Sequence, residues 1–204
     1  MDRKAHWETV YGTKRPDQVS WYQREATLSL TLIRRAVPDV AARIIDVGAG
    51  ASTLVDGLLA AGYSHVTVLD VSRAALEQAR ARLVHAASKV QWIEADVLAA
   101  PLQDAAYDLW HDRAVFHFLT DVKDRAAYVA QMRRALRPRG YVLIATFAED
   151  GPDRCSGLPV CRYSVTALHR EIGDAFRLVD TVREQHLTPA GFSQSFVYGV
   201  FRLA

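Results

Sequence analysis

Three carboxylates and two glycines occur at positions where an α/β sheet could gather them around a ligand. Asp46 lies near the end of one apolar stretch, Asp70 ends the next, and Asp96 follows a third. Gly48 and Gly50 come just after Asp46, and glycine permits a tight turn and a close backbone approach. Asp70 lies 20 residues beyond Gly50, which is the spacing at which an acid binds the ribose diol in Rossmann-type sites. One such acid alone would suit a solvated strand end, but three in succession favour a ligand site.

An alternation of strand-like and helix-like stretches would position these residues. Apolar runs predict strands at residues 43–47, 65–70, 90–94, 107–111 and 141–147. Helical patterns lie at about 52–61, 72–87 and 123–136. The alternation predicts an α/β fold with an open, Rossmann-like sheet that is mostly parallel and has helices on both faces. Ligands bind such sheets beyond the carboxyl ends of the parallel strands.

The N-terminal stretch precedes this sheet and reads as two helices. Residues 2–11 predict a short helix that Gly12 ends. Ser20 is expected to cap a second helix that runs to Val37 and stops before Pro38.

The C-terminal stretch predicts an antiparallel hairpin. Residues 176–185 and 195–203 are β-rich, and the short link between them contains Pro189 and Gly191. A link of this length joins antiparallel strands, whereas parallel strands need a longer crossover.

Composition narrows the class of protein. The 204 residues, 50% of them hydrophobic, suit one globular domain, and the net charge of +2 gives no basic footprint for nucleic acid or an anionic membrane. The N-terminus has no apolar core of signal-peptide length, and no apolar run approaches the roughly 18 residues of a membrane span, so we expect a cytoplasmic protein. Cys155 and Cys161 are too few for a disulfide framework or a structural zinc, and no metal is expected.

The residues of the glycine turn indicate which ligand it binds. A nicotinamide dinucleotide needs a cradle for its pyrophosphate, and Asp46 would place a fixed anion beside it. Thr53 also stands where the third glycine of the dinucleotide fingerprint would fall. The same anion suits an adenosine ligand that carries an ammonium and a sulfonium, as S-adenosylmethionine does.

Five segments, in order, resemble the motifs of the class I S-adenosylmethionine-dependent methyltransferases. IIDVGAGAS resembles the first, VTVLDVS the second and IEADVLAAPL the third, while YDLWHDRAVFHFL and LRPRGYVLIATF resemble the fourth- and fifth-strand segments. The resemblance implies that Asp70 binds the ribose, that Asp96 binds the adenine amino group, and that Val71 and Val97 pack beside the ring. The full set of cofactor contacts implied is Asp46, Gly48, Ala49, Gly50, Ser52, Asp70, Val71, Asp96, Val97 and Asp112.

The same resemblance implies a division of the chain and a class of acceptor. Residues 1–40 would form a helical cover, 43–147 the cofactor-binding core, and 148–204 an acceptor-side loop, a helix and the hairpin, with one strand antiparallel to the rest. The segment HDRAVFHFL is similar to a lysine-methylating branch that carries Asp-Lys-Gly at this place. Asp112, Arg113 and Ala114 differ from it at two of three positions, so a small-molecule acceptor is favoured over a protein lysine.

Candidates for the chemistry follow the fourth strand. Methyl transfer is an in-line displacement, so alignment and exclusion of water supply much of the catalysis, and a protonated acceptor needs a base. Asp112 and His117 are candidate catalytic residues, although His117 could equally pack between Phe116 and Phe118. We expect His111 to pack or cap locally.

Candidate acceptor-binding residues come from three regions, namely Trp21, Tyr22, Arg113, Arg162, Tyr163 and His186. Trp21 and Tyr22 could instead belong to the core, and the others could face water. Cys155 and Cys161 could bind a soft acceptor or have no role. Two further functions stay open: a nicotinamide-dependent oxidoreductase, and an idle relative that binds the cofactor and acts through a partner.

Overall fold

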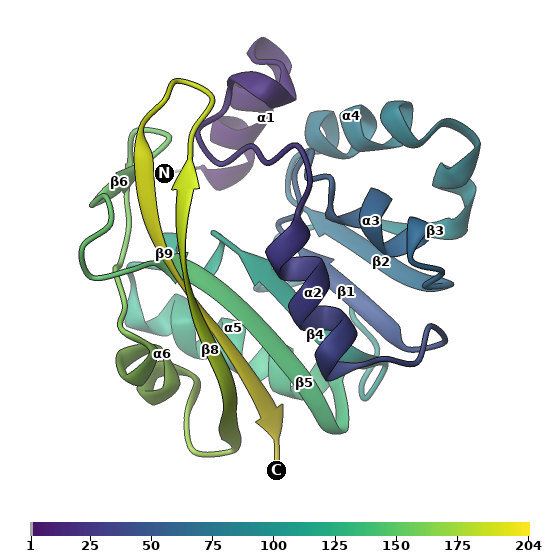
Figure 1. The fold of residues 1–204 in the computed structure, drawn as a ribbon, viewed down its shortest axis with the longest axis vertical. Coiled ribbons are helices and arrows are strands. Elements are labelled where there is room, and N and C mark those ends of the chain that lie inside the picture. Colours follow the sequence, from purple (N-terminus) through teal and green to yellow (C-terminus); the bar gives the residue numbers. More distant parts are fainter. Residues whose placement is uncertain (1) are drawn as a thin grey trace.

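The computed structural model describes residues 2–204 and contains a seven-stranded sheet flanked by helices (Figure 1). The strand order is β3-β2-β1-β4-β5-β9-β8. The strands are β1 (Arg43–Val47), β2 (His65–Asp70), β3 (Val90–Glu94), β4 (Tyr107–Arg113), β5 (Leu136–Phe147), β8 (Phe176–Leu187) and β9 (Ser193–Leu203). A separate two-stranded sheet pairs β6 (Arg154–Cys155) with β7 (Leu158–Pro159).

The sheet is mostly parallel, as the alternating pattern predicts. Strands β1 to β5 pair in parallel, β9 runs antiparallel to β5, and β8 runs antiparallel to β9. The order reverses between β1 and β4, so their carboxyl ends form the edge where a ligand is expected. The predicted fold class and the antiparallel C-terminal hairpin are confirmed.

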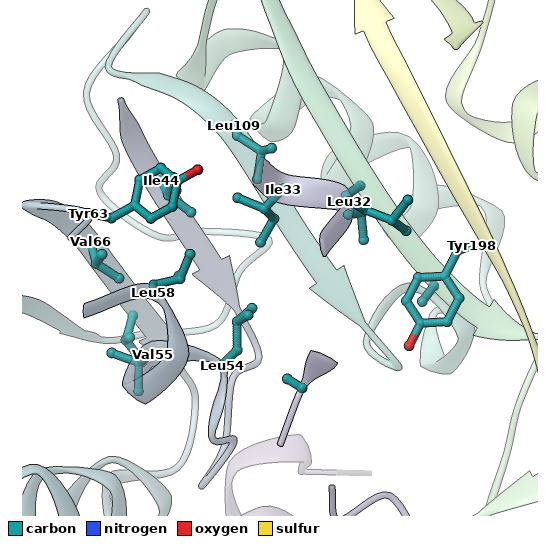
Figure 2. Packing of buried hydrophobic residues seen from close by; sticks show 14 of the residues in the cluster. Leu32, Ile33, Ile44, Leu54, Val55, Leu58, Tyr63, Val66, Leu109 and Tyr198 are labelled. Atoms are coloured by element: carbon teal, nitrogen blue, oxygen red, sulfur yellow. The ribbon is translucent and has the colours of Figure 1, made fainter. Parts of the chain in front are cut away.

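Helices pack on both faces of the sheet (Figure 1). They are α1 (Arg3–Thr13), α2 (Thr27–Ala36), α3 (Leu54–Ala60), α4 (Arg73–Leu83), α5 (Val122–Ala135) and α6 (Val165–Ile172). Ile44 and Ile45 are both completely buried, but Ile44 packs with α2 and α3 while Ile45 packs with α5 and α6. Figure 2 shows the first of these clusters, where Ile33 and Leu58 meet Ile44 and Val66. Successive strand residues point to opposite faces, so a strand covered on both faces reads as an apolar run.

The predicted strand bounds are reproduced for β1, β2 and β3, whereas β4 and β5 are longer than predicted. The predicted end of the 72–87 helix is also wrong, because α4 ends at Leu83 and a 3₁₀ turn, Val84–Lys89, follows it. Helix α1 continues through Gly12 to Thr13, since nothing crowds that glycine and one glycine is tolerated at a helix end. Met1, the first residue of the predicted cover, lies outside the described residues.

The helix predicted to begin at Ser20 begins instead at Thr27. Residues of the preceding segment use their backbone groups for tertiary contacts: the carbonyl of Ser20 accepts from His186, and the carbonyl of Trp21 accepts from Arg113. Those carbonyls are therefore unavailable to a helical ladder. The consequence is a loop, residues 19–26, that runs along the sheet edge.

Among residues 2–204 the structure has no helix long and apolar enough to cross a membrane. The same residues contain no cluster of three or more histidine, cysteine, aspartate or glutamate side chains suited to a metal ion.

Candidate active site

A cavity lies beyond the carboxyl ends of the parallel strands, beneath α1 and the 19–26 loop. The empty space inside it, counted out through its open mouth, is about 1250 Å³. Strand-end residues of the predicted cofactor site line it, namely Asp46, Gly48, Ala49, Ser52, Asp70, Val71, Asp96 and Val97. The sequence-predicted residues of the first three motifs are thus brought together.

The glycine turn adopts a backbone conformation that favours glycine. Gly48 and Gly50 both have φ of 56°. A Cβ at Gly48 would overlap the side chain of Val115, and one at Gly50 would overlap the hydroxyl of Tyr11. Gly50 does not itself line the cavity wall, but its amide donates to Oδ2 of Asp70 over 2.7 Å.

Asp70 is buried and holds two turns together. Its Oδ2 accepts from Gly50, and its Oδ1 accepts from the amide of Ser72 over 2.8 Å. Burial raises the pKa of Asp70 to about 6, although the two amide bonds favour the carboxylate. Each carboxylate oxygen accepts two hydrogen bonds, so both can still receive a hydroxyl.

Asp96 is more open than the other two acids. Its Oδ1 accepts from the amide of Leu98 over 2.9 Å, and its Oδ2 lies 3.4 Å from the guanidinium of Arg3. Arg3 also pairs with Asp124, and Lys4 pairs with Glu94 over 2.5 Å. The start of α1 is therefore fastened to the β3 end of the cavity by ion pairs.

Asp46 has a partner that the sequence analysis did not assign to it. Its Oδ1 lies 2.6 Å from Nδ1 of His111, and Nε2 of His111 lies 2.9 Å from Oγ of Ser29. All three line the cavity, yet Asp46 is only 2% exposed, and its Oδ2 has no hydrogen-bond partner. His111 and Asp46 are direct neighbours in the β1–β4 register. The strand order of the predicted fold could have indicated this pair, because β1 and β4 are adjacent in this topology.

The N-terminal aromatic residues form the roof. Trp7 packs edge-on against Trp21 and Phe118, and the indole N–H of Trp21 donates to the Tyr11 hydroxyl over 3.3 Å. All four side chains line the cavity. Tyr22 lines it too.

Glu8 fastens α1 to the start of α4. Its carboxylate accepts from the amides of Arg73 and Ala74, over 2.7 and 3.1 Å, and from the Ser72 hydroxyl. A carboxylate at a helix N-terminus satisfies free amides and favours the helix dipole. Gln78 adds a bond from α4 to the backbone carbonyl of Tyr11.

Arg113 lines the cavity beside the roof and is held on every side. Its guanidinium donates to Tyr198 Oη, to the carbonyl of Trp21 and, over 3.4 Å, to Glu184. It also stacks over the ring of Phe196. The Glu184 carboxylate compensates its charge, so this wall of the cavity carries little net charge.

The two candidate catalytic residues do not line the cavity. Asp112 is completely buried and accepts from the amides of Val115 and Phe116 and from the Tyr128 hydroxyl. Burial raises the pKa of Asp112 to about 6. The carboxylate thus shapes the turn after β4.

His117 is packed in the core, as the alternative interpretation expects, but against Phe118 and Phe147 rather than between Phe116 and Phe118. Its ring contacts Phe118 and Phe147, and Nε2 has no hydrogen-bond partner. Complete burial lowers the pKa of His117 to about 3, so the ring is neutral at pH 7.

Three candidate acceptor residues also lie elsewhere. Arg162 donates to the carbonyl of Gly151, and Tyr163 is buried against Phe116, both outside the cavity. His186 is buried against Ser20 and Phe196. Of the two cysteines, Cys155 lines the cavity and Cys161 does not; burial raises the pKa of the Cys155 thiol to about 12.

Comparison with known proteins agrees with this arrangement. Residues 44–140 match the family model described as a methyltransferase domain. An uncharacterized methyltransferase of Mycobacterium tuberculosis is 29% identical over 108 residues, which cover 51% of this chain and 50% of that protein. These matches support the class I S-adenosylmethionine-dependent methyltransferase family for this chain. Asp46, Gly48 and Gly50 fall at the start of the matched methyltransferase domain.

Two further methyltransferases extend the comparison. The ubiquinone biosynthesis O-methyltransferase of Aromatoleum aromaticum is 30% identical over 146 residues, 69% of this chain and 56% of that protein. The matched part of the chain spans about half the length of the curated relatives. A Burkholderia thailandensis 1,6-didemethyltoxoflavin-N1-methyltransferase, solved with bound 1,6-didemethyltoxoflavin and S-adenosylhomocysteine, has a TM-score of 0.78 at 19% identity, covering 98% of this chain and 88% of that one. At this identity the structural match shows that the two chains share a fold.

Proposed function

We propose that this protein transfers a methyl group from S-adenosylmethionine to a small-molecule acceptor. The observation that carries the proposal is the cavity at the ends of β1, β2 and β3, where a glycine turn and buried acids meet. The family match supports the same donor.

The proposed adenosine position follows from the acids and valines on β2 and β3. Asp70 would accept the two ribose hydroxyls with the lone pairs that Gly50 and Ser72 leave free. Val71 and Val97 would pack against the adenine, with Asp96 at its amino group. Gly48, Ala49 and Ser52 would line the path to the methionine portion, and Gly50 would hold the turn behind them.

The charge of the cavity floor favours a cationic donor over a dinucleotide. The Oδ2 of Asp46 is buried without a partner, and the charges of Asp46 and Glu8 add to the raised pKa of Asp70. A buried carboxylate is costly unless a cation or hydrogen-bond donor meets it. An ammonium beside a sulfonium meets that need, whereas a pyrophosphate would add negative charge. The nicotinamide alternative is therefore not favoured.

We propose a small acceptor because α1 and the 19–26 loop cover the cavity with aromatic side chains. Trp21, Tyr22 and Arg113 line the cavity on the side away from Asp70 and are the proposed acceptor contacts. Glu184 neutralises Arg113, so a neutral acceptor fits this wall better than an anion. Cys155 lies there as a buried thiol with a raised pKa, which does not favour a thiolate role.

The chain's contribution to the chemistry would be alignment and exclusion of water. S-adenosylmethionine, when bound, supplies a methyl group already activated by its sulfonium. The aromatic roof would keep water out and hold the acceptor in line, where a misplacement of about 1 Å costs roughly a hundredfold in rate. Asp112 and His117 have no proposed contact with the acceptor, because neither lines the cavity.

Two measurements test this function in sequence. Calorimetric titrations should show binding of S-adenosylhomocysteine and no comparable binding of NAD⁺ or NADP⁺. A panel of hydroxylated, amine and thiol aromatics, with a lysine peptide alongside, is then incubated with methyl-labelled S-adenosylmethionine. Label on a small molecule supports the proposal, and label on the peptide alone contradicts the acceptor class. Cofactor binding without any transfer would favour an idle relative.

A further inference from the structure

A buried polar chain crosses the cavity floor from α2 through β4 to β1. It consists of Ser29, His111 and Asp46, joined by contacts of 2.9 and 2.6 Å. None of the three side chains is more than 3% exposed, and all three line the cavity. Of these three residues, only Asp46 belongs to the glycine-turn motif that resembles the methyltransferases.

The chemistry of the groups fixes the direction of the hydrogen bond between His111 and Asp46. A carboxylate has no hydrogen to give, so Nδ1 of His111 donates to Oδ1 of Asp46. Nε2 forms the second hydrogen bond, with the hydroxyl of Ser29, which can either donate or accept. Ser29 holds the ring, and the ring holds one oxygen of the carboxylate.

The result is a carboxylate with one oxygen fixed and the other free. Oδ2 of Asp46 is buried, without a partner, and belongs to a residue on the cavity wall. An unpaired buried carboxylate oxygen costs stability, which a ligand that donates hydrogen bonds would recover. The bond to Oδ1 prevents the carboxylate from rotating to exchange its oxygens.

We propose that His111, held by Ser29, is a positioning residue that aims Oδ2 of Asp46 at the α-ammonium of the methyl donor. The inference rests on the proposed function, because it requires that the donor's amino-acid portion lies above β1. Its consequence is specific: His111 contributes to affinity for the amino-acid portion of the ligand and leaves affinity for the adenosine portion unchanged.

Two commercial ligands separate those portions. S-adenosylhomocysteine carries the ammonium, whereas 5′-methylthioadenosine has the same adenosine and thioether without the amino acid. Removing a hydrogen bond to a charged group reduces affinity by about ten- to a hundredfold. His111→Leu should therefore weaken S-adenosylhomocysteine by at least about tenfold and 5′-methylthioadenosine by less than about threefold.

A conservative variant tests the role rather than the residue. The side-chain amide of asparagine can donate from a place near Nδ1, so His111→Asn should keep S-adenosylhomocysteine affinity within about threefold of wild type. His117→Leu is the matched control, since it removes another fully buried histidine that lies outside the cavity. It should leave both affinities unchanged.

The outcomes are distinguishable by calorimetric titration at pH 7.5, with thermal unfolding to check that each variant is folded. The inference is supported if His111→Leu loses affinity for S-adenosylhomocysteine alone and His111→Asn recovers that affinity. An equal loss of affinity for both ligands, or no loss for either, overturns the inference and leaves His111 a structural residue. If wild type binds neither ligand, the proposed function itself fails.

Discussion

The amide of Gly50 donates to Oδ2 of Asp70 over 2.7 Å, and this bond joins the glycine turn after β1 to the end of β2. The same carboxylate receives the amide of Ser72 at the start of α4. Two segments of the proposed cofactor site are thus held in register by one side chain. A substitution at Asp70 therefore acts on the ligand and on both turns.

Replacing Asp70 with asparagine should weaken S-adenosylhomocysteine by about ten- to a hundredfold. The amide keeps one acceptor oxygen for a turn but places an N–H₂ where the ribose and Gly50 both need an acceptor. Calorimetric titration measures the affinity, and circular dichroism checks the fold. Affinity equal to wild type would remove Asp70 from the site.

Cofactor affinity should fall with decreasing pH near the pKa of Asp70, which burial raises to about 6. A protonated carboxyl has lost acceptor capacity, so binding two hydroxyls favours the ionised form. From pH 7.5 to pH 5 the ionised fraction falls by roughly tenfold, and S-adenosylhomocysteine affinity should fall with it. In Asp70→Asn the affinity should depend less on pH. An equally steep pH dependence in that variant would show that another group titrates.

The same raised pKa fixes the sign of its effect on stability without ligand. Because the folded pKa lies above the ordinary value of 3.8, Asp70 contributes stability that is present below pH 3.8 and is lost as pH rises through about 6. The bound cofactor should oppose this loss. Thermal unfolding with and without S-adenosylhomocysteine should accordingly diverge most above pH 6.

Gly50 and Tyr11 should be energetically coupled. Gly50→Ala places a Cβ against the Tyr11 hydroxyl and also carries the cost of a positive φ, so it should destabilise the protein by about 1–3 kcal/mol. Tyr11→Ala removes the overlap but not the backbone cost. In urea unfolding, the double variant should be less destabilised than the sum of the two single changes. If the two changes in the free energy of unfolding simply add, Tyr11 does not pack against this turn.

Glu8→Gln should loosen the roof at the cavity mouth. The change removes the negative charge that caps α4 at Arg73 and Ala74, worth about 0.3–1 kcal/mol. S-adenosylhomocysteine should dissociate several-fold faster, which stopped-flow tryptophan fluorescence can follow because Trp7 and Trp21 line the cavity. Glu77→Gln, on the exposed face of α4, is the matched control and should leave the rate unchanged. Equal rates in wild type and Glu8→Gln would separate this contact from ligand release.

Asp112 should contribute more to stability than His117. Asp112→Asn replaces one oxygen that accepts hydrogen bonds and should cost about 1–3 kcal/mol in urea unfolding. His117→Leu removes Nε2, which is buried without a partner, and also Nδ1, which accepts from the amide of Phe147 over 3.4 Å. The gain and the loss should largely cancel, so the free energy of unfolding should change by less than about 1 kcal/mol. If His117→Leu bound cofactor normally but abolished methyl transfer, a catalytic role for that histidine would be restored.

The sequence alone determined the sheet and the places where its first three strands end. Apolar runs gave the bounds of β1, β2 and β3, and the acids with Gly48 and Gly50 marked the ligand edge. These features depend on residues close together in the chain, where alternation, turn chemistry and helix signals act. These local patterns did not predict which candidate residues after β4 line the cavity. A 3₁₀ turn, Phe116–Phe118, directs His117 into the core instead.

Only the tertiary structure decided how distant residues meet. The pairing of Asp46 with His111 requires β1 and β4 to be neighbours in one register, and the contact with Ser29 requires α2 to lie over both. The loop before α2 was predicted as helix because its backbone partners, Arg113 and His186, come from strands formed much later in the chain. Hydrogen bonds across such sequence distances outweigh local propensity once packing has excluded water, and no local pattern encodes them.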